Sequence, residues 1–268
     1  MSMNTTRIYA VFLRYVYLLR GNPQRFFQIF VWATIDVVLW GFITKYLNTL
    51  GSPEFSFTPL FLGAVILWSF LIRAQQGVST PALEDTWSHN LLNYFASPLK
   101  VSEYMSGLVL ASIATSIAGF SLVLVLAYLF FGLSIFSLGL MLFPFLLILF
   151  AFGIALGIFA IAMITRYGPS AEWFIWPIPA VIEPFCGVLY PISVLPHWMQ
   201  VISYVLPPSY IFSGMRDALL NGHFAAGNLL AAAVLGVAYL LAAYWFYVRI
   251  HRSAIRSGSI ARYSAENI

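Results

Sequence analysis

Long apolar runs separated by short polar segments dominate the chain. Several runs exceed the roughly 18 residues that a membrane-spanning helix needs, and they lack the two-residue alternation of a membrane β-barrel. The pattern therefore predicts an all-α membrane protein with six transmembrane helices. In the fourth of these, Gly153 and Gly157 have the spacing that lets two helices approach closely. The expected spans cover residues 26–45, 59–76, 104–131, 138–164, 173–190 and 225–248.

The polar segment before the first span, residues 1–25, has the pattern of an amphipathic helix. Ile8 and Phe12 recur on one side of that helix, whereas Arg7 and Arg14 lie on another. A helix of this kind lies in the membrane interface, with its basic side chains near anionic lipid headgroups. The alternative is a simple extension of the first span.

The most polar segment between two spans is residues 77–103. We expect a short helix over residues 81–96, because Pro81 suits the first turn of a helix and Ser97-Pro98 would end it. Glu84 and Asp85 would then lie near the positive end of the helix dipole.

Basic residues are distributed unequally over the polar segments, and Lys and Arg near short loops stay in the cytoplasm. With both termini inside, the outer side receives only Lys45 and Arg216. This asymmetry predicts a multi-pass protein of the plasma (inner) membrane, with a cytoplasmic tail over residues 249–268. The inner side receives Arg7, Arg14, Arg20, Arg25, Arg73, Lys100, Arg166, Arg249, Arg252, Arg256 and Arg262.

Acids outnumber bases in only one inner segment, residues 77–103. It contains Glu84, Asp85 and Glu103 but only one basic residue, Lys100. A lipid-binding loop would be basic, whereas an acidic segment that also carries aromatic side chains suits a protein partner. The alternative is a solvated loop that packs on its own helix bundle.

A second irregular region begins within residues 173–190, where three prolines must break or kink the helix. Two short helices are expected after it, over residues 197–206 and 209–221. Each is too short to cross a bilayer. We therefore predict a re-entrant or interfacial hairpin over residues 191–224 on the outer face, where it could act as a gate.

Two acids are expected at membrane depth, Asp36 and Glu183. A charge at the middle of a span costs roughly 2.5 to 3.5 kcal/mol, so Asp36 must be protonated, paired or facing water. Each acid could line a translocation path or could fix helix packing. A different hypothesis makes the two acids the site of an intramembrane enzyme that acts on a lipid.

Composition excludes other classes of protein. With 61% hydrophobic and 8% charged residues in 268 positions, we expect one transmembrane domain and no soluble domain of ordinary size. The four histidines are scattered, Cys186 has no second cysteine to pair with, and no phosphate-binding loop occurs. We therefore expect no catalytic site, metal or cofactor in this chain, and no nucleic acid partner.

Together these features resemble the membrane subunit of type-2 ABC exporters, a permease family that includes drug, polysaccharide and lipid exporters. The resemblance extends over nearly the whole chain, and the outer hairpin is its most specific part. It rests on the N-terminal amphipathic helix, on the cytoplasmic helix ending in Ala96-Ser97-Pro98, and on Tyr190-Pro191, Leu195-Pro196, Trp198, Pro207-Pro208, Tyr210, Met215-Arg216 and Gly222.

The resemblance implies an ATP-driven permease that moves an amphipathic, lipid-linked, glycan or drug-like substrate outward. A separate ABC-type ATPase subunit would bind ATP and Mg, and two permease copies among membrane lipids would form the pathway as a homodimer. A non-transporting assembly subunit is a further alternative. The residues expected to couple to the ATPase are Glu84, Asp85, Trp87, His89, Tyr94 and Pro98. Those expected in the path or gate are Asp36, Glu183, Tyr210 and Arg216.

Overall fold

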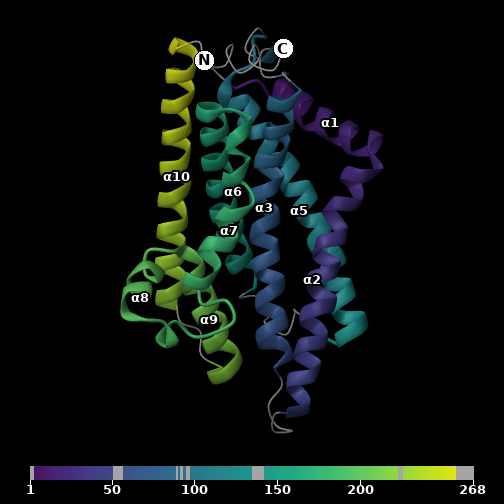
Figure 1. The fold of residues 1–268 in the computed structure, drawn as a ribbon, viewed down its shortest axis with the longest axis vertical. Helices are drawn as coiled ribbons and strands as arrows, with labels where there is room; N and C mark the ends of the chain where they lie inside the picture. The colour runs from purple at the N-terminus through teal and green to yellow at the C-terminus, as the bar shows by residue number, and fades with distance from the viewer. Residues whose placement is uncertain are drawn as a thin grey trace.

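The computed structural model describes residues 3–50, 57–88, 90, 93–94, 97–134, 142–222 and 226–257, and within these ranges the protein is helical without strands. Long helices run along one direction and form an elongated bundle (Figure 1). These are α2 (Pro23–Leu50), α3 (Gly63–Trp87), α5 (Val101–Phe131), α6 (Leu142–Tyr167) and α10 (Ala226–Ser257).

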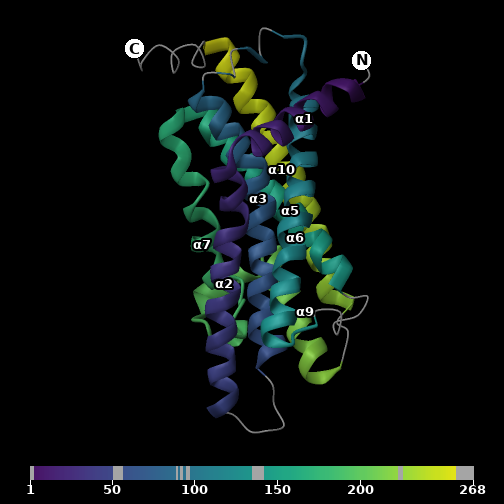
Figure 2. The ribbon, with the colours of Figure 1, turned by 90° about the vertical axis from the view of Figure 1, so that its right-hand side faces the viewer.

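The segment expected to form an amphipathic helix at the N-terminus is helical, as α1 (Thr5–Gly21). Its first turn is capped by Asn4, whose side-chain oxygen accepts a hydrogen bond from the Thr6 N–H at 2.9 Å. α1 lies across the end of the bundle where α10 also ends, so the start of α1 and the end of α10 share one end (Figures 1 and 2).

Five helices of the described chain are long and apolar enough to cross a membrane. The fifth predicted span, residues 173–190, is not a continuous helix. Its residues form part of the short segments η3 (Pro169–Phe174), α7 (Pro177–Ile182) and η4 (Glu183–Phe185). The predicted break is confirmed, because each proline lacks the N–H that a helix interior needs. Figures 1 and 2 show this stretch leading from the end of α6 towards the opposite end of the bundle.

The separate helix predicted over residues 81–96 is wrong at its start, because α3 continues without a break to Trp87 and contains Pro81 in its interior. The Ser79 hydroxyl, two residues before Pro81, donates to the Gln75 carbonyl at 2.9 Å within α3. Pro81 removes one backbone hydrogen bond, but Ser79, Pro81 and Ala82 are buried, and this packing holds the helix together. Glu84 and Asp85 therefore lie at the C-terminal end of α3.

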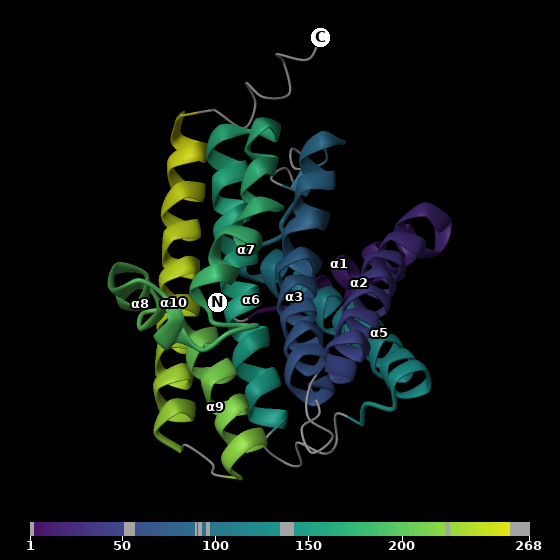
Figure 3. The same ribbon diagram turned by 60° about the horizontal axis from the view of Figure 1, so that its bottom comes forward.

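Helix α3 occupies the centre of the bundle, between α6 with α10 on one side and α5 with α2 on the other (Figure 3). The close approach predicted from Gly153 and Gly157 is confirmed, and it is made with α3. A Cβ atom at Gly153 would lie 2.6 Å from the Leu71 carbonyl oxygen, and one at Gly157 would lie 2.8 Å from the Gln75 carbonyl oxygen. Only glycine permits the observed α3–α6 distance.

Two short helices follow the broken crossing, as predicted for the hairpin. They are α8 (His197–Ser203) and α9 (Pro207–Asn221), preceded by the 3₁₀ turn η5 (Ile192–Val194). Pro207 and Pro208 do not separate the helices but begin α9, where a missing N–H costs nothing. The hairpin lies at the end of the bundle opposite α1 (Figure 1).

Candidate functional site

A cavity of about 420 Å³ lies between α1, α2, α3 and α5. One face of α3 supplies a polar stripe to its wall. The stripe residues are four or three positions apart, the spacing that places side chains on one side of a helix. From Ser69 to Glu84 the stripe extends about 22 Å along α3 at 1.5 Å per residue. The stripe consists of Ser69, Arg73, Gln76, Thr80 and Glu84.

The opposite walls are mostly aromatic and apolar, with one acid. Asp36 and Trp32 come from α2, Tyr15 comes from α1, and Trp176 comes from the broken crossing. Because Tyr15 and Glu84 lie near the end of the bundle that carries α1, the cavity extends from that end into the membrane-spanning part of the helices. Asp36 thus faces a cavity with polar groups, one of the environments that a membrane acid requires.

The place of Arg73 corrects the sequence interpretation, which counted it among the basic residues of the inner side. It lies near the middle of the span Thr58–Trp87, because α3 continues well beyond the predicted end at Gln76. A Cβ atom at Gly119 of α5 would lie 2.5 Å from the Arg73 Nη1, so the guanidinium lies against the backbone of α5. Arg73 and Asp36 bring opposite charges to one cavity.

A buried polar cluster joins α1 to the end of α3. Asp85 is only 2% exposed. Its Oδ1 lies 2.6 Å from Nη2 of Arg14, and its Oδ2 accepts a hydrogen bond from the Tyr104 hydroxyl at 2.9 Å. Arg14 also donates to the Tyr94 hydroxyl. Burial, together with the charge of Asp85, raises the pKa of Tyr94 to about 12, so this phenol keeps its proton at neutral pH.

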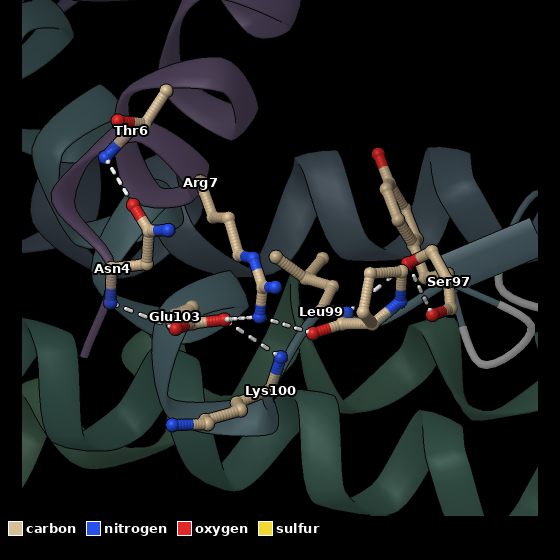
Figure 4. Close-up of polar contacts among 9 residues, drawn as sticks. Asn4, Thr6, Arg7, Ser97, Leu99, Lys100 and Glu103 are labelled. Carbon is tan, nitrogen blue, oxygen red and sulfur yellow. Dashed lines mark hydrogen bonds and ion pairs between the residues drawn. The ribbon is translucent and has the colours of Figure 1, made fainter. Parts of the chain in front are cut away.

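A second cluster joins α1 to the start of α5, around Glu103, whose side chain is 0% exposed (Figure 4). Its Oε1 accepts from the Asn4 N–H and its Oε2 from the Lys100 N–H, both at 2.9 Å. Arg7 completes the cluster, with Nη1 3.5 Å from Oε2 of Glu103 and 2.5 Å from the Pro98 carbonyl oxygen. We call the ion pairs Arg14–Asp85 and Arg7–Glu103, with these hydrogen bonds, the α1 latch.

The latch corrects the expectation of an acidic surface on residues 77–103. Asp85 and Glu103 are buried against arginines of α1, and Glu84 is half-buried and lines the cavity. These acids therefore hold helices together or face the cavity instead of forming an outward patch. Long-range pairs of this kind, such as Asn4 with Glu103, leave no local sequence signal.

The other residues expected to couple to an ATPase lie at this end of the bundle. Trp87, the last residue of α3, is 52% exposed, and Pro98 is also exposed. Tyr94 is half-buried in the latch. His89 lies outside the described residues.

The residues expected in a gate lie apart from the cavity. Glu183 begins η4, is half-buried, and is not among the described residues that line the cavity, but it lies near enough to Asp36 for the two carboxyl groups to interact electrostatically. Arg216 of α9 donates to the Gly187 carbonyl at 2.9 Å, and Tyr210 donates to the Tyr204 carbonyl at 2.9 Å. These bonds fix the hairpin and tie it to the turn after η4.

Sequence reasoning missed three features of the site: Arg73, the stripe on α3, and the partners of the latch. The spacing of the stripe could have revealed it, since polar residues recur every three or four positions through a predicted span. Within the described part of the chain, no three His, Cys, Asp or Glu side chains gather in a way that could hold a metal ion.

The sequence model of the family described as "ABC-2 type transporter" matches residues 7–220, which is most of the chain. The chain belongs to the ABC-2 type transporter family. The match begins in α1 and ends in α9, so it includes the latch, the cavity and the hairpin. The resemblance inferred from the sequence is confirmed: the chain is a multi-pass permease of an ABC transporter. A comparison with curated proteins finds no match.

Proposed function

We propose that this ABC-2 permease is the transmembrane subunit of an ATP-driven exporter that works with a separate ATPase subunit. The observation that carries the proposal is the cavity, which extends from the end of the bundle at α1 into its membrane-spanning part. A permease needs such a polar space to take a substrate out of the cytoplasm or inner leaflet. In the proposal the protein lies in the plasma (inner) membrane, and this end of the bundle faces the cytoplasm. Both termini then lie on the cytoplasmic side.

Coupling would begin at the junction of α3 and α5. Trp87 and Pro98 are exposed there and would contact the ATPase, which binds ATP and Mg. His89 belongs to the same proposed contact. Asp85 and Tyr94 would act differently, by holding the junction to α1.

Movement at this junction would reach the cavity through α3. The helix is continuous from Trp87 back to Gly63, and its stripe forms one cavity wall. The latch links α1, α3 and α5, so a displacement of the junction would move three walls of the cavity together. Such rigid-body movement of packed helices is a common form of alternating access.

Release would take place at the opposite end, where the hairpin of α8 and α9 would act as an outer gate with Glu183, Tyr210 and Arg216. The bond from Arg216 to the Gly187 carbonyl supports this role, because it ties the hairpin to the broken crossing. The pathway would be completed by a second copy of the chain in a homodimer surrounded by membrane lipids.

The test is reconstitution of the permease with its ATPase in lipid vesicles, comparing the native chain with Trp87→Ala. Truncating an exposed aromatic at the centre of a contact removes binding energy, so we expect transport to fall about tenfold while ATP hydrolysis continues. Trp245→Ala is the matched control, since Trp245 is also exposed but lies on α10.

Two results would overturn the proposal. One is ATP hydrolysis by the purified permease alone. The other is transport by Trp87→Ala equal to that of the native chain and of Trp245→Ala. A complex that binds the ATPase but exports nothing would favour the non-transporting assembly subunit instead.

A further inference from the structure

We propose that the cavity binds an amphipathic organic monocation, with Asp36 and Glu84 selecting its charge and Trp32, Tyr15 and Trp176 holding its body. This inference names the substrate class of the proposed exporter and so rests on the proposed function. It follows from the charges, the aromatic walls and the size of the cavity.

The charges that line the cavity favour a cation. Among the described lining residues are two carboxylates, Asp36 and Glu84, and one guanidinium, Arg73. An anionic ligand would have to approach Arg73 past these two carboxylates, and like charges repel strongly where water is scarce. A monocation would instead be attracted by both carboxylates.

The three charged side chains of the lining lie in different places. The Arg73 guanidinium lies against Gly119 of α5, where even one added methyl group would collide with it. The two carboxylates come from different walls, Asp36 from α2 and Glu84 from the end of α3 near α1. A cation could therefore meet Glu84 near the cytoplasmic end and Asp36 deeper in the cavity.

Aromatic rings supply the second determinant. Trp32 and Trp176 are both exposed, and both line the cavity with Tyr15. The faces of indole and phenol rings attract organic cations, and this attraction is greatest where the cation has lost its water. Leu19 and Ile72 add apolar surface for the hydrocarbon part of the ligand.

The dimensions suit a small molecule. A volume of about 420 Å³ lies within the range of roughly 300 to 1,000 Å³ that is usual for such ligands. A polymer chain would need a continuous channel. We therefore assign the cavity to a compact ligand with one positive charge and an apolar body.

The experiment measures binding to the purified permease alone in lipid nanodiscs, without the ATPase. The probes are tetraphenylphosphonium and tetraphenylborate, which share shape and size and differ in the sign of their charge. Empty nanodiscs correct for partition into lipid. We expect the native chain to bind the cation at least about tenfold more tightly than the anion, which corresponds to one decade in the dissociation constant.

Variants locate the site. Asp36→Asn and Glu84→Gln each remove one lining charge and should weaken cation binding about tenfold, whereas Asp36→Glu should restore it. Trp32→Ala should also weaken it. Asp217→Asn is the matched control, because Asp217 is an acid of α9 that is not part of the cavity lining.

Equal or tighter binding of the anion would overturn the inference, as would native affinity in both Asp36→Asn and Glu84→Gln. A loss of affinity in Asp217→Asn as large as in the cavity variants would do the same. The two proposals can fail separately. Cation binding without ATP-driven transport contradicts the exporter, and ATP-driven transport without cation binding contradicts only the substrate class.

Discussion

Asp85 shows how a charged residue can be part of the interior of a membrane protein. It is almost completely buried, and both of its carboxylate oxygens are used, one by Arg14 and one by Tyr104. A buried carboxylate is tolerated only with such partners, because water no longer solvates its charge. The α1 latch thus turns two acids of a polar segment into structural contacts.

The first prediction concerns the pair Arg14–Asp85. Asp85→Asn removes one charge of the pair, and we expect the free energy of unfolding to fall by about 1 to 3 kcal/mol. This cost is smaller than the roughly 3 to 5 kcal/mol for breaking a fully buried pair, because the Arg14 side chain is 36% exposed and is partly solvated. Thermal and denaturant unfolding in detergent would measure the change.

A double-mutant cycle tests whether the pair acts as a unit. Asp85→Asn combined with Arg14→Gln should cost less than the sum of the two single changes. Arg20→Gln is the matched control, since Arg20 is an exposed arginine of the same helix, and it should leave stability within about 0.5 kcal/mol. Strictly additive costs would show that Asp85 and Arg14 do not support each other.

For single residues, sequence analysis identified the unusual charged side chains better than it identified the residues that they contact. Asp36 could be recognised because an acid within an apolar run is conspicuous, and it does line a cavity. The place of Arg73 within the membrane could not be recognised, because it depends on where α3 ends, and Pro81 suggested an earlier end. Asp85 and Glu103 pair with residues far away in the chain, and nothing local predicts that.

Helix α3 is the element that determines most of the site. Its polar stripe lines the cavity, its buried faces pack on α5 and α6, and its last residue, Trp87, is exposed at the proposed ATPase contact. Local rules predicted a helix boundary at Pro81, whereas tertiary packing extended the helix to Trp87. In the broken crossing, by contrast, three prolines act together, and the rule that proline breaks a helix predicted the structure correctly.

The second prediction tests the α3–α6 contact. Gly153→Ala would place a methyl group 2.6 Å from the Leu71 carbonyl oxygen, so the two helices would have to separate. We expect a loss of about 1 to 3 kcal/mol in unfolding free energy, as is usual for overpacking. The melting temperature in detergent would report it.

Gly227→Ala provides the control for this change. A Cβ atom at Gly227 of α10 would have nothing within 4 Å, so the same chemical substitution should leave stability unchanged or raise it slightly. If Gly153→Ala melted like the native chain and like Gly227→Ala, the close packing of α6 on α3 would be wrong.

At the scale of the whole molecule, the asymmetry of the basic residues and the arrangement of the helices agree. The start of α1 and the end of α10 lie at one end of the bundle, and the hairpin of α8 and α9 lies at the other (Figures 1 and 2). Moving Arg73 from the inner side to the middle of a span leaves the charge asymmetry in place. The arrangement is thus compatible with both termini on one side of the membrane, although one of the spans is not a continuous helix; that this side is the cytoplasm stays a prediction.

The third prediction places the two ends of the bundle on opposite sides of the membrane. Cys186, the sole cysteine, is completely buried, so the native chain should not react with a membrane-impermeant maleimide. Ser170→Cys then adds an exposed thiol just after α6, and Val194→Cys adds one in η5, where Val194 is 70% exposed. In intact cells the reagent should label Val194→Cys and should not label Ser170→Cys.

Inside-out vesicles should reverse this result, and labelling after denaturation should be equal for the two variants, which controls for expression. The reversal matters because the cavity begins at the end of the bundle near Ser170, so the side that labels Ser170→Cys is the side from which a substrate would enter. Labelling of Ser170→Cys in intact cells would place that entrance outside. Both the cytoplasmic ATPase contact at Trp87 and the outward direction of transport would then be wrong, because they depend on the same orientation.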